Sequence, residues 1–244
     1  MSSVLVVIPT YNEAASIEGV IRRVLALAIP NEEIEVLVVD DGSPDGTGEI
    51  VTALAEPRVH LLVRPAKAGL GRAYLAGFAW ALAREFDVIV EMDGDGSHLP
   101  EQLERLLSAM ASGADLVIGS RWIPGGKVDN WSLIRQGLSR AGNGYARMAL
   151  GFGLHDATAG YRAFTRKALE RLDLENVDSN GYCFQIDLAW RAAQRNLKIV
   201  EVPITFVERT SGVSKMSKGI VLEAIWQITK WGLNRIRASR RLPA

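Results

Sequence analysis

Cysteine is scarce in this sequence. Cys183 is the one cysteine among 244 residues, which excludes an intrachain disulfide. Long apolar runs are absent as well, since none approaches the roughly 18 residues that a membrane-spanning helix needs. The first residues carry no basic segment, and their apolar run is too short for a secretion signal. With 48% hydrophobic and 23% charged residues, the composition predicts a globular protein, and the missing export signal and lone thiol fit a reducing, cytoplasmic location.

Glycine-rich nucleotide-binding motifs are also missing. Neither the segment after residue 8 nor the 40–48 loop has the Gly-X-Gly-X-X-Gly spacing of a dinucleotide site, and there is no Gly-Lys-Ser/Thr phosphate loop. Phosphates are therefore expected to be held by a metal ion and basic side chains. No Ser-His-Asp or Cys-His set is present, so covalent catalysis is not indicated. His98, beside an acidic loop, is interpreted as a supporting or capping residue rather than a catalytic one.

What the sequence does contain is a regular alternation of apolar runs and helical patterns over its first 120 residues. A continuous apolar run predicts a buried strand at 4–8, and mostly apolar stretches predict further strands at 34–39, 59–63, 88–92 and 115–119. Helical spacing predicts helices at about 14–28, 48–55, 71–84 and 101–112. This order implies one α/β domain with a mostly parallel central sheet and helices on both faces.

Beyond residue 120 the pattern is less regular. We expect a loop at 121–131, a helix at about 133–150, a short strand at 161–165, a helix at about 181–195 and β-structure at 198–207. The polar segment 208–217 is predicted to be a loop that closes over a bound substrate. A last helix is predicted at 220–236.

The acidic stretch after the fourth predicted strand is the central feature of the sequence. Residues 92–100 read Met-Asp-Gly-Asp-Gly-Ser-His-Leu-Pro, with the proline at the first turn of the next helix. Asp93 and Asp95 suit Mg²⁺ or Mn²⁺, which take carboxylates together with substrate phosphates. The plainer alternative is a solvated turn. Because parallel strands end at one edge, this loop is expected to meet the other strand-end acids, Glu13, Asp40 and Asp41.

The strand-end loops 9–13 and 40–47 are predicted to bind a nucleotide. Their carboxylates can accept hydrogen bonds from a base or ribose, and Tyr11 can stack on a base. We assign Asp41 to ligand contact, whereas Asp45 and Thr47 are interpreted as caps of the following helix.

Basic side chains for a phosphate group follow later elements. Arg121 comes directly after the fifth predicted strand, and a guanidinium group matches phosphate oxygens in geometry. Arg135, Arg209 and Lys215 are further candidates, and each of them taken alone is equally well a surface charge.

The C-terminal segment carries most of the charge asymmetry. From Lys215 to the end there are seven basic residues and one acidic residue. Apolar residues of 220–236 recur at helical spacing, with tryptophan among them, as in helices that lie on anionic membranes. We predict that 218–244 contacts a membrane surface, with a C-terminal helix docked on the core as the alternative.

Taken together, the motifs resemble a known family. Those of the first half are Pro-Thr-Tyr-Asn-Glu (9–13), Asp-Asp-Gly-Ser-Pro-Asp-Gly-Thr (40–47), Gly-Leu-Gly (69–71), Asp-Gly-Asp-Gly-Ser-His-Leu-Pro (93–100) and Gly-Ser-Arg (119–121). They resemble the inverting nucleotide-sugar glycosyltransferases of family two, which have the GT-A fold. Those of the second half are Asn-Trp-Ser-Leu-Ile-Arg (130–135), Asp-Ala-Thr-Ala-Gly-Tyr-Arg (156–162), Gly-Tyr-Cys-Phe-Gln-Ile-Asp (181–187), Val-Pro-Ile-Thr-Phe-Val-Glu-Arg (202–209) and Gly-Val-Ser-Lys (212–215). They narrow the resemblance to the dolichol- or polyprenol-phosphate mannose synthases.

The resemblance implies a reaction and a set of site residues. The implied reaction is transfer of mannose from GDP-mannose to a polyprenyl monophosphate with inversion. Guanosine contacts are implied for Pro9, Tyr11, Glu13, Val39 and Asp41. The metal and diphosphate site is implied for Asp93, Gly94 and Asp95. Phosphate contacts are implied for Arg121, Arg209 and Lys215, with Arg135 joining them, and catalysis for Asp95, Arg121 and Arg209. Many relatives have Ala-Asp-Leu at 94–96, so Gly-Asp-Gly is expected to loosen this loop.

The resemblance also implies a division of the chain and a set of partners. Residues 1–217 are expected to be the catalytic domain and 218–244 a basic amphipathic helix. The expected partners are GDP-mannose, a polyprenyl phosphate, and the cytoplasmic face of a membrane or an integral membrane protein, with no nucleic acid. Transfer of glucose or N-acetylglucosamine from a UDP-sugar to the same lipid is the nearest alternative. A nucleotide-sugar pyrophosphorylase lacks support because no glycine-rich N-terminal loop with Arg and Lys is present. A nucleotide-binding module without catalysis is a third alternative.

Overall fold

The computed structural model describes residues 2–177, 182–208 and 224–233, and the structural statements below concern these residues. Seven strands form one sheet in the order β3-β2-β1-β4-β7-β5-β8. The strands are β1 (Ser2–Thr10), β2 (Glu32–Asp40), β3 (Val59–Val63), β4 (Val88–Glu91), β5 (Leu116–Ser120), β7 (Arg162–Thr165) and β8 (Ile199–Pro203). Two short strands, β6 (Lys127–Asp129) and β9 (Thr205–Val207), pair in a second, parallel sheet.

The large sheet is mostly parallel, as predicted, with β7 as the exception. β7 pairs antiparallel with both β4 and β5. Residues 156–161, which precede β7, lie near the carboxyl end of β5. The chain therefore enters β7 at the carboxyl edge of the parallel strands and runs antiparallel to them. The sequence predicted a strand here but not its place between β4 and β5.

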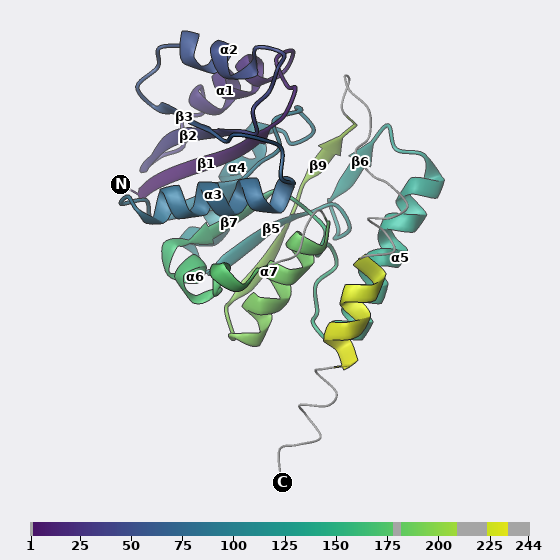
Figure 1. The fold of residues 1–244 in the computed structure, drawn as a ribbon. Helices are drawn as coiled ribbons and strands as arrows, with labels where there is room; N and C mark the ends of the chain where they lie inside the picture. Colours follow the sequence, from purple (N-terminus) through teal and green to yellow (C-terminus); the bar gives the residue numbers. More distant parts are fainter. Residues whose placement is uncertain (1, 178–181, 209–223, 234–244) are drawn as a thin grey trace.

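Helices cover both faces of the sheet and divide its core in two (Figure 1). One face is covered by α1 (Ile17–Leu25), α2 (Thr47–Ala53) and α4 (Leu103–Ala111). The other is covered by α3 (Leu70–Leu82), α6 (Arg166–Arg171) and α7 (Tyr182–Gln194), with α5 (Leu133–Leu150) beside them. Alternate residues of β1 enter the two cores, because successive side chains of a strand point to opposite faces.

Most predicted elements are found within a few residues of their expected bounds. The prediction of an irregular 121–131 loop was incomplete, because β6 lies within it, and α6 was not predicted. Short 3₁₀ turns at Pro100–Gln102 and Leu174–Asn176 precede α4 and α7. Residues 209–217 of the predicted substrate-closing loop lie outside the described residues.

The described part of the C-terminal segment is a helix at 224–233 that packs along α5 (Figure 1). Ile228 is buried, and the Thr229 and Tyr145 hydroxyls are 2.6 Å apart. Trp231 stacks on Trp190 of α7 with ring centroids 5.5 Å apart. This helix is therefore docked on the core, as one of the two alternatives predicted. Within the ranges that the structure describes, no helix combines the length and apolarity needed to cross a membrane.

Candidate functional site

The ends of β1, β2 and β4 bring three acidic loops to one edge of the sheet. Thr10 and Asp40 are register partners at the ends of β1 and β2, and the Thr10 hydroxyl donates to Asp40 Oδ1 at 2.9 Å. Ser16 Oγ donates to the Gly94 carbonyl at 2.8 Å and lies 3.4 Å from the Glu13 carboxylate. The three loops therefore lie side by side, as the parallel strand order predicted.

The predicted nucleotide contacts Asp41 and Tyr11 each have a basic neighbour. Asp41 is 5% exposed, and Arg64 Nη1 donates to its Oδ1 at 2.6 Å. Lys67 Nζ lies 4.3 Å from the centroid of the Tyr11 ring, which was predicted to stack on a base. Both basic residues come from the loop after β3. The sequence reading missed them, although their place after the strand next to β2 was a usable signal.

Pro9 and Val39 lie inside the sheet. They are register partners of β1 and β2, and the Val39 side chain is fully buried. It faces α3, where a Cβ added to Gly77 would come within 3.3 Å of Val39 Cγ2. A contact between Val39 and a nucleotide would therefore be made by the main chain.

Asp45 and Thr47 join two site loops. Asp45 accepts hydrogen bonds from the Ala14 N–H at 3.0 Å and from Thr47 Oγ1 at 2.6 Å, and Thr47 Oγ1 accepts the Glu13 N–H at 3.1 Å. The N-cap position of α2 is Gly46, which makes no side-chain capping bond. Asp45 Oδ1 also accepts the Thr47 N–H, the first of α2, at 3.1 Å, so Asp45 caps the helix from the position before Gly46, as predicted. Thr47 is the first helical residue, and its hydroxyl binds the loop that carries Glu13.

The Asp93-Gly94-Asp95 loop is held closely by its surroundings. Asp95 Oδ1 accepts the Ser97 N–H at 3.0 Å, and the Tyr74 hydroxyl lies 3.4 Å from Asp93 Oδ1. A Cβ on Gly94 would lie 3.1 Å from a methyl group of Ile8, so the loop packs directly on β1. Gly96 has a φ of +78°, which a side chain rarely adopts. The expectation that Gly-Asp-Gly loosens the loop therefore misses what the two glycines do here: one allows close packing and the other a left-handed turn.

His98 supports this loop from inside the protein. Its Nδ1 accepts the Asp93 N–H at 3.0 Å, and its ring lies between Tyr161 and Phe206, with centroids 5.0 and 5.3 Å away. Burial lowers the pKa of His98 to about 4, so the ring is neutral and carries its proton on Nε2. These contacts support the interpretation of His98 as a supporting residue.

The donor set of this loop fits a hard divalent cation. Asp93 and Asp95 offer carboxylate oxygens, which Mg²⁺ and Mn²⁺ prefer. In the part of the chain that the structure describes, no three His, Cys, Asp or Glu side chains cluster as a metal site. Ions of this kind commonly take one or two protein carboxylates, with substrate phosphates completing their coordination.

Arg121, at the end of β5, is buried and tightly paired. It is 6% exposed, and Asp156 is fully buried. Arg121 Nε and Nη2 donate to the two Asp156 oxygens, each at 2.7 Å, and the Arg121 N–H donates to Asp156 Oδ2 at 2.9 Å. Thr158 Oγ1 accepts a further bond from Nη2 at 2.8 Å. Sequence analysis identified the arginine but not its carboxylate, which lies 35 residues away along the chain.

Arg135 lies at the start of α5 and faces the same region. Its guanidinium carbon is 3.9 Å from the centroid of the Trp131 ring, and Nη1 forms an ion pair with Glu208. The Arg121 guanidinium carbon lies 5.4 Å from the same ring, so both arginines border Trp131. Arg209 and Lys215 lie outside the described residues.

A second buried arginine, which the sequence analysis did not single out, lies behind the acidic loop. Arg162 of β7 is fully buried and donates to the carbonyls of Ala157, Ala159 and Gln185 at 2.6, 2.8 and 2.7 Å. Its Nε is 3.9 Å from the carboxylate of Glu91, which is also fully buried. Arg162 thus joins the 157–159 loop to α7 and to the strand that ends in the acidic loop.

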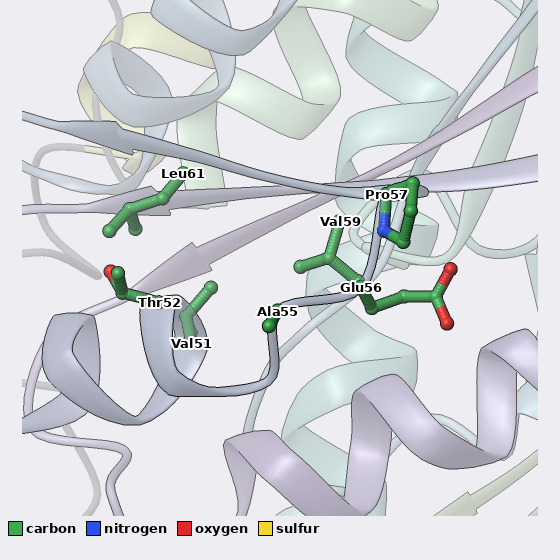
Figure 2. Close-up of a pocket in the computed structure, with 7 residues that line it drawn as sticks. All are labelled: Val51, Thr52, Ala55, Glu56, Pro57, Val59 and Leu61. Carbon is green, nitrogen blue, oxygen red and sulfur yellow. The ribbon is translucent and has the colours of Figure 1, made fainter.

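A hollow of about 320 Å³ lies away from these residues, between α2 and the edge strand β3 (Figure 2). Its lining is Val51, Thr52, Ala55, Glu56, Pro57, Val59 and Leu61. These residues include the start of β3 and therefore lie toward the amino ends of the parallel strands, whereas the acidic loops lie at the carboxyl ends. The hollow is not part of the candidate site.

Comparison with known proteins relates this geometry to a family. The sequence model of glycosyl transferase family 2 matches residues 5–173. A polyprenol monophosphomannose synthase of Mycolicibacterium smegmatis is 56% identical over 232 residues, which make up 94% of this chain and 86% of that protein. An undecaprenyl-phosphate mannosyltransferase of Micrococcus luteus is 55% identical over 94% of each chain.

Solved structures show the same fold. A glucosyl-3-phosphoglycerate synthase of Mycobacterium tuberculosis in complex with phosphoglyceric acid has a TM-score of 0.68 at 23% identity, covering 96% of this chain and 80% of that one. A complex of this enzyme with Mn²⁺, UDP-glucose and phosphoglyceric acid also has a TM-score of 0.68, at 22% identity, covering 96% and 79%. The predicted fold class is therefore confirmed.

Proposed function

The chain belongs to glycosyl transferase family 2, and we propose that it transfers mannose from GDP-mannose to a polyprenyl monophosphate with inversion at the anomeric carbon. The observation that carries the proposal is the identity of 56% and 55%, over 94% of this chain, to two enzymes named for mannose transfer or polyprenyl phosphomannose synthesis. The product is a polyprenyl phosphate β-mannose, a lipid-linked mannose donor.

The charge distribution at the site suits this reaction. As the nucleoside diphosphate leaves, the anomeric carbon gains oxocarbenium character, and the acceptor phosphate attacks it from the opposite face. A phosphate monoester has a second pKa of roughly 6, so the acceptor is already anionic near neutral pH and needs no strong general base. It does need cations that draw two anions together, and we assign this to Arg121, Arg135, Arg209 and Lys215.

The donor side is assigned to the three acidic loops. We propose that Pro9, Tyr11, Glu13, Val39 and Asp41 contact guanosine. Asp93 and Asp95, separated by Gly94, would hold Mg²⁺ or Mn²⁺. Such a cation, when bound, neutralises charge on the leaving diphosphate. The chain's own part is to keep both carboxylates at the carboxyl edge, through the packing of Gly94 on Ile8 and the Asp95–Ser97 hydrogen bond.

Lipid extraction tests the reaction directly. The full chain is incubated with GDP-[¹⁴C]mannose, Mg²⁺ and vesicles containing a polyprenyl phosphate, and label is counted after extraction into organic solvent. Parallel reactions use UDP-glucose and UDP-N-acetylglucosamine as donors. Label in lipid from GDP-mannose alone is the expected result. Label from a UDP-sugar instead would replace the donor assignment, and pyrophosphate-dependent release of GTP from GDP-mannose would indicate a pyrophosphorylase.

The metal assignment has its own test. Asp95→Ala should lower turnover at saturating Mg²⁺ by about 100-fold or more, the scale on which loss of a charge-stabilising group acts. Glu104→Gln, on the exposed side of α4, removes one carboxylate elsewhere and should leave turnover unchanged. Near-normal turnover of Asp95→Ala in Mg²⁺ or Mn²⁺ would contradict the assignment.

We also propose that the protein works at the cytoplasmic surface of a membrane, where its acceptor is held. Among the described residues, seven of the nine exposed large hydrophobic side chains lie on α5 and the 224–233 helix, namely Leu133, Ile134, Leu138, Met148, Ile225, Trp226 and Leu233. Exposed basic residues of the two helices, Arg140, Arg147 and Lys230, accompany them. Apolar side chains together with cations suit an anionic lipid surface. We call these seven residues the apolar face.

Vesicle binding tests this face with a matched control. Leu138→Glu and Met148→Glu should reduce co-sedimentation with anionic vesicles by about tenfold, since each removes apolar contact and adds repulsion. Val63→Glu changes a residue of similar exposure, 61%, on the distant edge strand β3 and should bind like the wild type. Equal binding of all variants would refute the proposal that the apolar face contacts the membrane. Recruitment to native membranes but not to protein-free vesicles would assign it to an integral membrane partner.

A further inference from the structure

Asn143 lies on the narrow side of α5 that the protein buries. The buried residues of this helix are Asn143, Ala146 and Leu150, so one of three is an amide. Burying an amide costs free energy unless it is hydrogen-bonded, and asparagine is a mediocre helix former. The contacts of this amide therefore indicate why it is there.

The Asn143 amide contacts both groups that hold Arg121. Its Nδ2 donates to the Ser139 carbonyl within α5 at 3.0 Å, and it also lies 3.1 Å from Thr158 Oγ1 and 3.3 Å from Asp156 Oδ1. Its Oδ1 accepts the Thr158 N–H at 3.3 Å. Asp156 Oδ1 and Thr158 Oγ1 are also the acceptors of Arg121 Nη2. Asn143 thus acts on the partners of the arginine and not on the arginine itself.

We propose that Asn143 is a positioning residue for Arg121. It fixes the Asp156 carboxylate and the Thr158 hydroxyl, and these set the direction in which the guanidinium is held at the end of β5. The proposal rests on the proposed function, in which Arg121 contacts a substrate phosphate. Asn143 belongs to α5, which also carries part of the apolar face. The position of the Arg121 guanidinium therefore depends on the position of α5.

The arrangement suits a role in positioning because the arginine, its carboxylate and the amide are all buried. Arg121, Asp156 and Asn143 are 6%, 0% and 3% exposed. Water therefore has little access to replace the amide when it is removed. A reacting group displaced by about 1 Å can cost on the order of 100-fold in rate.

The first test observes Arg121 without substrate. In ¹⁵N-labelled full-length protein, the Arg121 Nε–H signal is identified by its loss in Arg121→Lys, and its exchange with solvent is measured. Asn143→Ala should speed this exchange by about tenfold or more, because the hydrogen bonds of Arg121 to Asp156 and Thr158 open more often. The Arg162 Nε–H signal in the same spectrum, and the Arg121 signal in the packing control Leu150→Ala, should change by less than about twofold.

The second test is a double-mutant cycle on mannose transfer. Asn143→Ala should lower kcat/KM for the acceptor by about 10- to 100-fold in the wild-type background and by less than about twofold in Arg121→Ala. Asn143→Asp keeps the shape but replaces the donor with a carboxylate facing Asp156, so it should be at least as impaired. Leu150→Ala should have the same small effect in both backgrounds. Asn143→Ser replaces Asn143→Ala if that variant does not fold.

The outcomes separate this proposal from the proposed function. Unchanged Arg121 exchange in Asn143→Ala, additive losses in the cycle, or full activity of Asn143→Asp would overturn the positioning role. If the wild type transfers no mannose to lipid, the proposed function fails, and the holding of Arg121 by Asn143 is decided by the exchange measurement alone.

Discussion

Two buried arginines of this protein, Arg121 and Arg162, both contact the 156–159 segment and are held in different ways. Arg121 forms a bidentate pair with Asp156, in which its Nε and Nη2 donate to the two carboxylate oxygens. Arg162 donates to three main-chain carbonyls, and its nearest carboxylate, Glu91, lies 3.9 Å away. The first arrangement fixes the direction of a cation at a strand end, whereas the second joins separate backbone segments.

The difference teaches that burial alone does not tell a functional arginine from a structural one. Bidentate pairing keeps a guanidinium in one orientation, which is useful where a phosphate must be met. Donation to carbonyls of two different segments stabilises the packing of those segments. We therefore expect changes at Arg162 to act mainly on stability and changes at Arg121 mainly on activity.

The largest effect is expected from Arg162→Met. Three carbonyls lose their donor inside the protein, at about 1–3 kcal/mol for each unsatisfied group, so the free energy of unfolding should fall by about 3–5 kcal/mol. Denaturant titration at pH 7 measures this. Arg22→Met is the control: Arg22 is 67% exposed in a surface pair, and its loss should cost less than about 0.5 kcal/mol. A loss of less than about 1 kcal/mol in the Arg162→Met variant would show that Arg162 is not a structural arginine.

Arg121→Lys is expected to have the next largest effect, and on a different quantity. Lysine keeps the positive charge beside Asp156 but has no planar fork, so kcat/KM for mannose transfer should fall by about 100-fold. The free energy of unfolding should fall by no more than about 2 kcal/mol, because Asp156 keeps a cation and its other donors. Steady-state kinetics and denaturant titration of one preparation measure both. Normal kinetics together with a loss of stability as large as that of Arg162→Met would show that Arg121, too, is structural.

The sequence predicted the elements of the fold better than their arrangement. Mostly apolar stretches such as 34–39 and 88–92 identify buried strands because a strand covered on both faces has little polar character. The place of β7 could not be read in the same way. It depends on the path of residues 121–161, whose short β6 and irregular turns have no strong periodicity.

For the site, the sequence predicted types of residue but not their partners. Acids and basic residues after strands were recognisable because parallel strands end at one edge. The partners Asp156, Asn143 and Arg64 were not recognisable, because hydrogen bonds between residues 13 to 35 positions apart leave no periodic signal. Glu91 was interpreted only as one residue of a strand. A carboxylate at the end of a strand predicted to be buried indicates a buried partner, which was not considered.

Glu91 completes the contrast between the two arginines through its protonation. Burial, partly offset by Arg162, raises the pKa of Glu91 from 4.5 to about 8, so at neutral pH Arg162 faces a neutral carboxyl group. Burial also lowers the pKa of Arg162 to about 10, which leaves it charged. Asp156 accepts three hydrogen bonds from Arg121, whereas Glu91 lies beyond hydrogen-bond distance of the Arg162 Nε.

The smallest effect we predict is the pH dependence of Glu91→Gln, measured with a chelator present so that no cation sits at the neighbouring acidic loop. Between about pH 5 and 8 the folded protein holds a proton on Glu91 that the unfolded chain has released. This group's stabilisation is therefore complete below pH 4.5 and is lost as the pH rises through about 8. Glutamine does not titrate, so the variant should gain about 1 kcal/mol per pH unit on the wild type between pH 6 and 7.5. Glu104→Gln, which removes an exposed carboxylate of α4, controls for charge. A pH-independent difference would mean that Glu91 is ionised in the fold, and Arg162 would then face a charged carboxylate as Arg121 does.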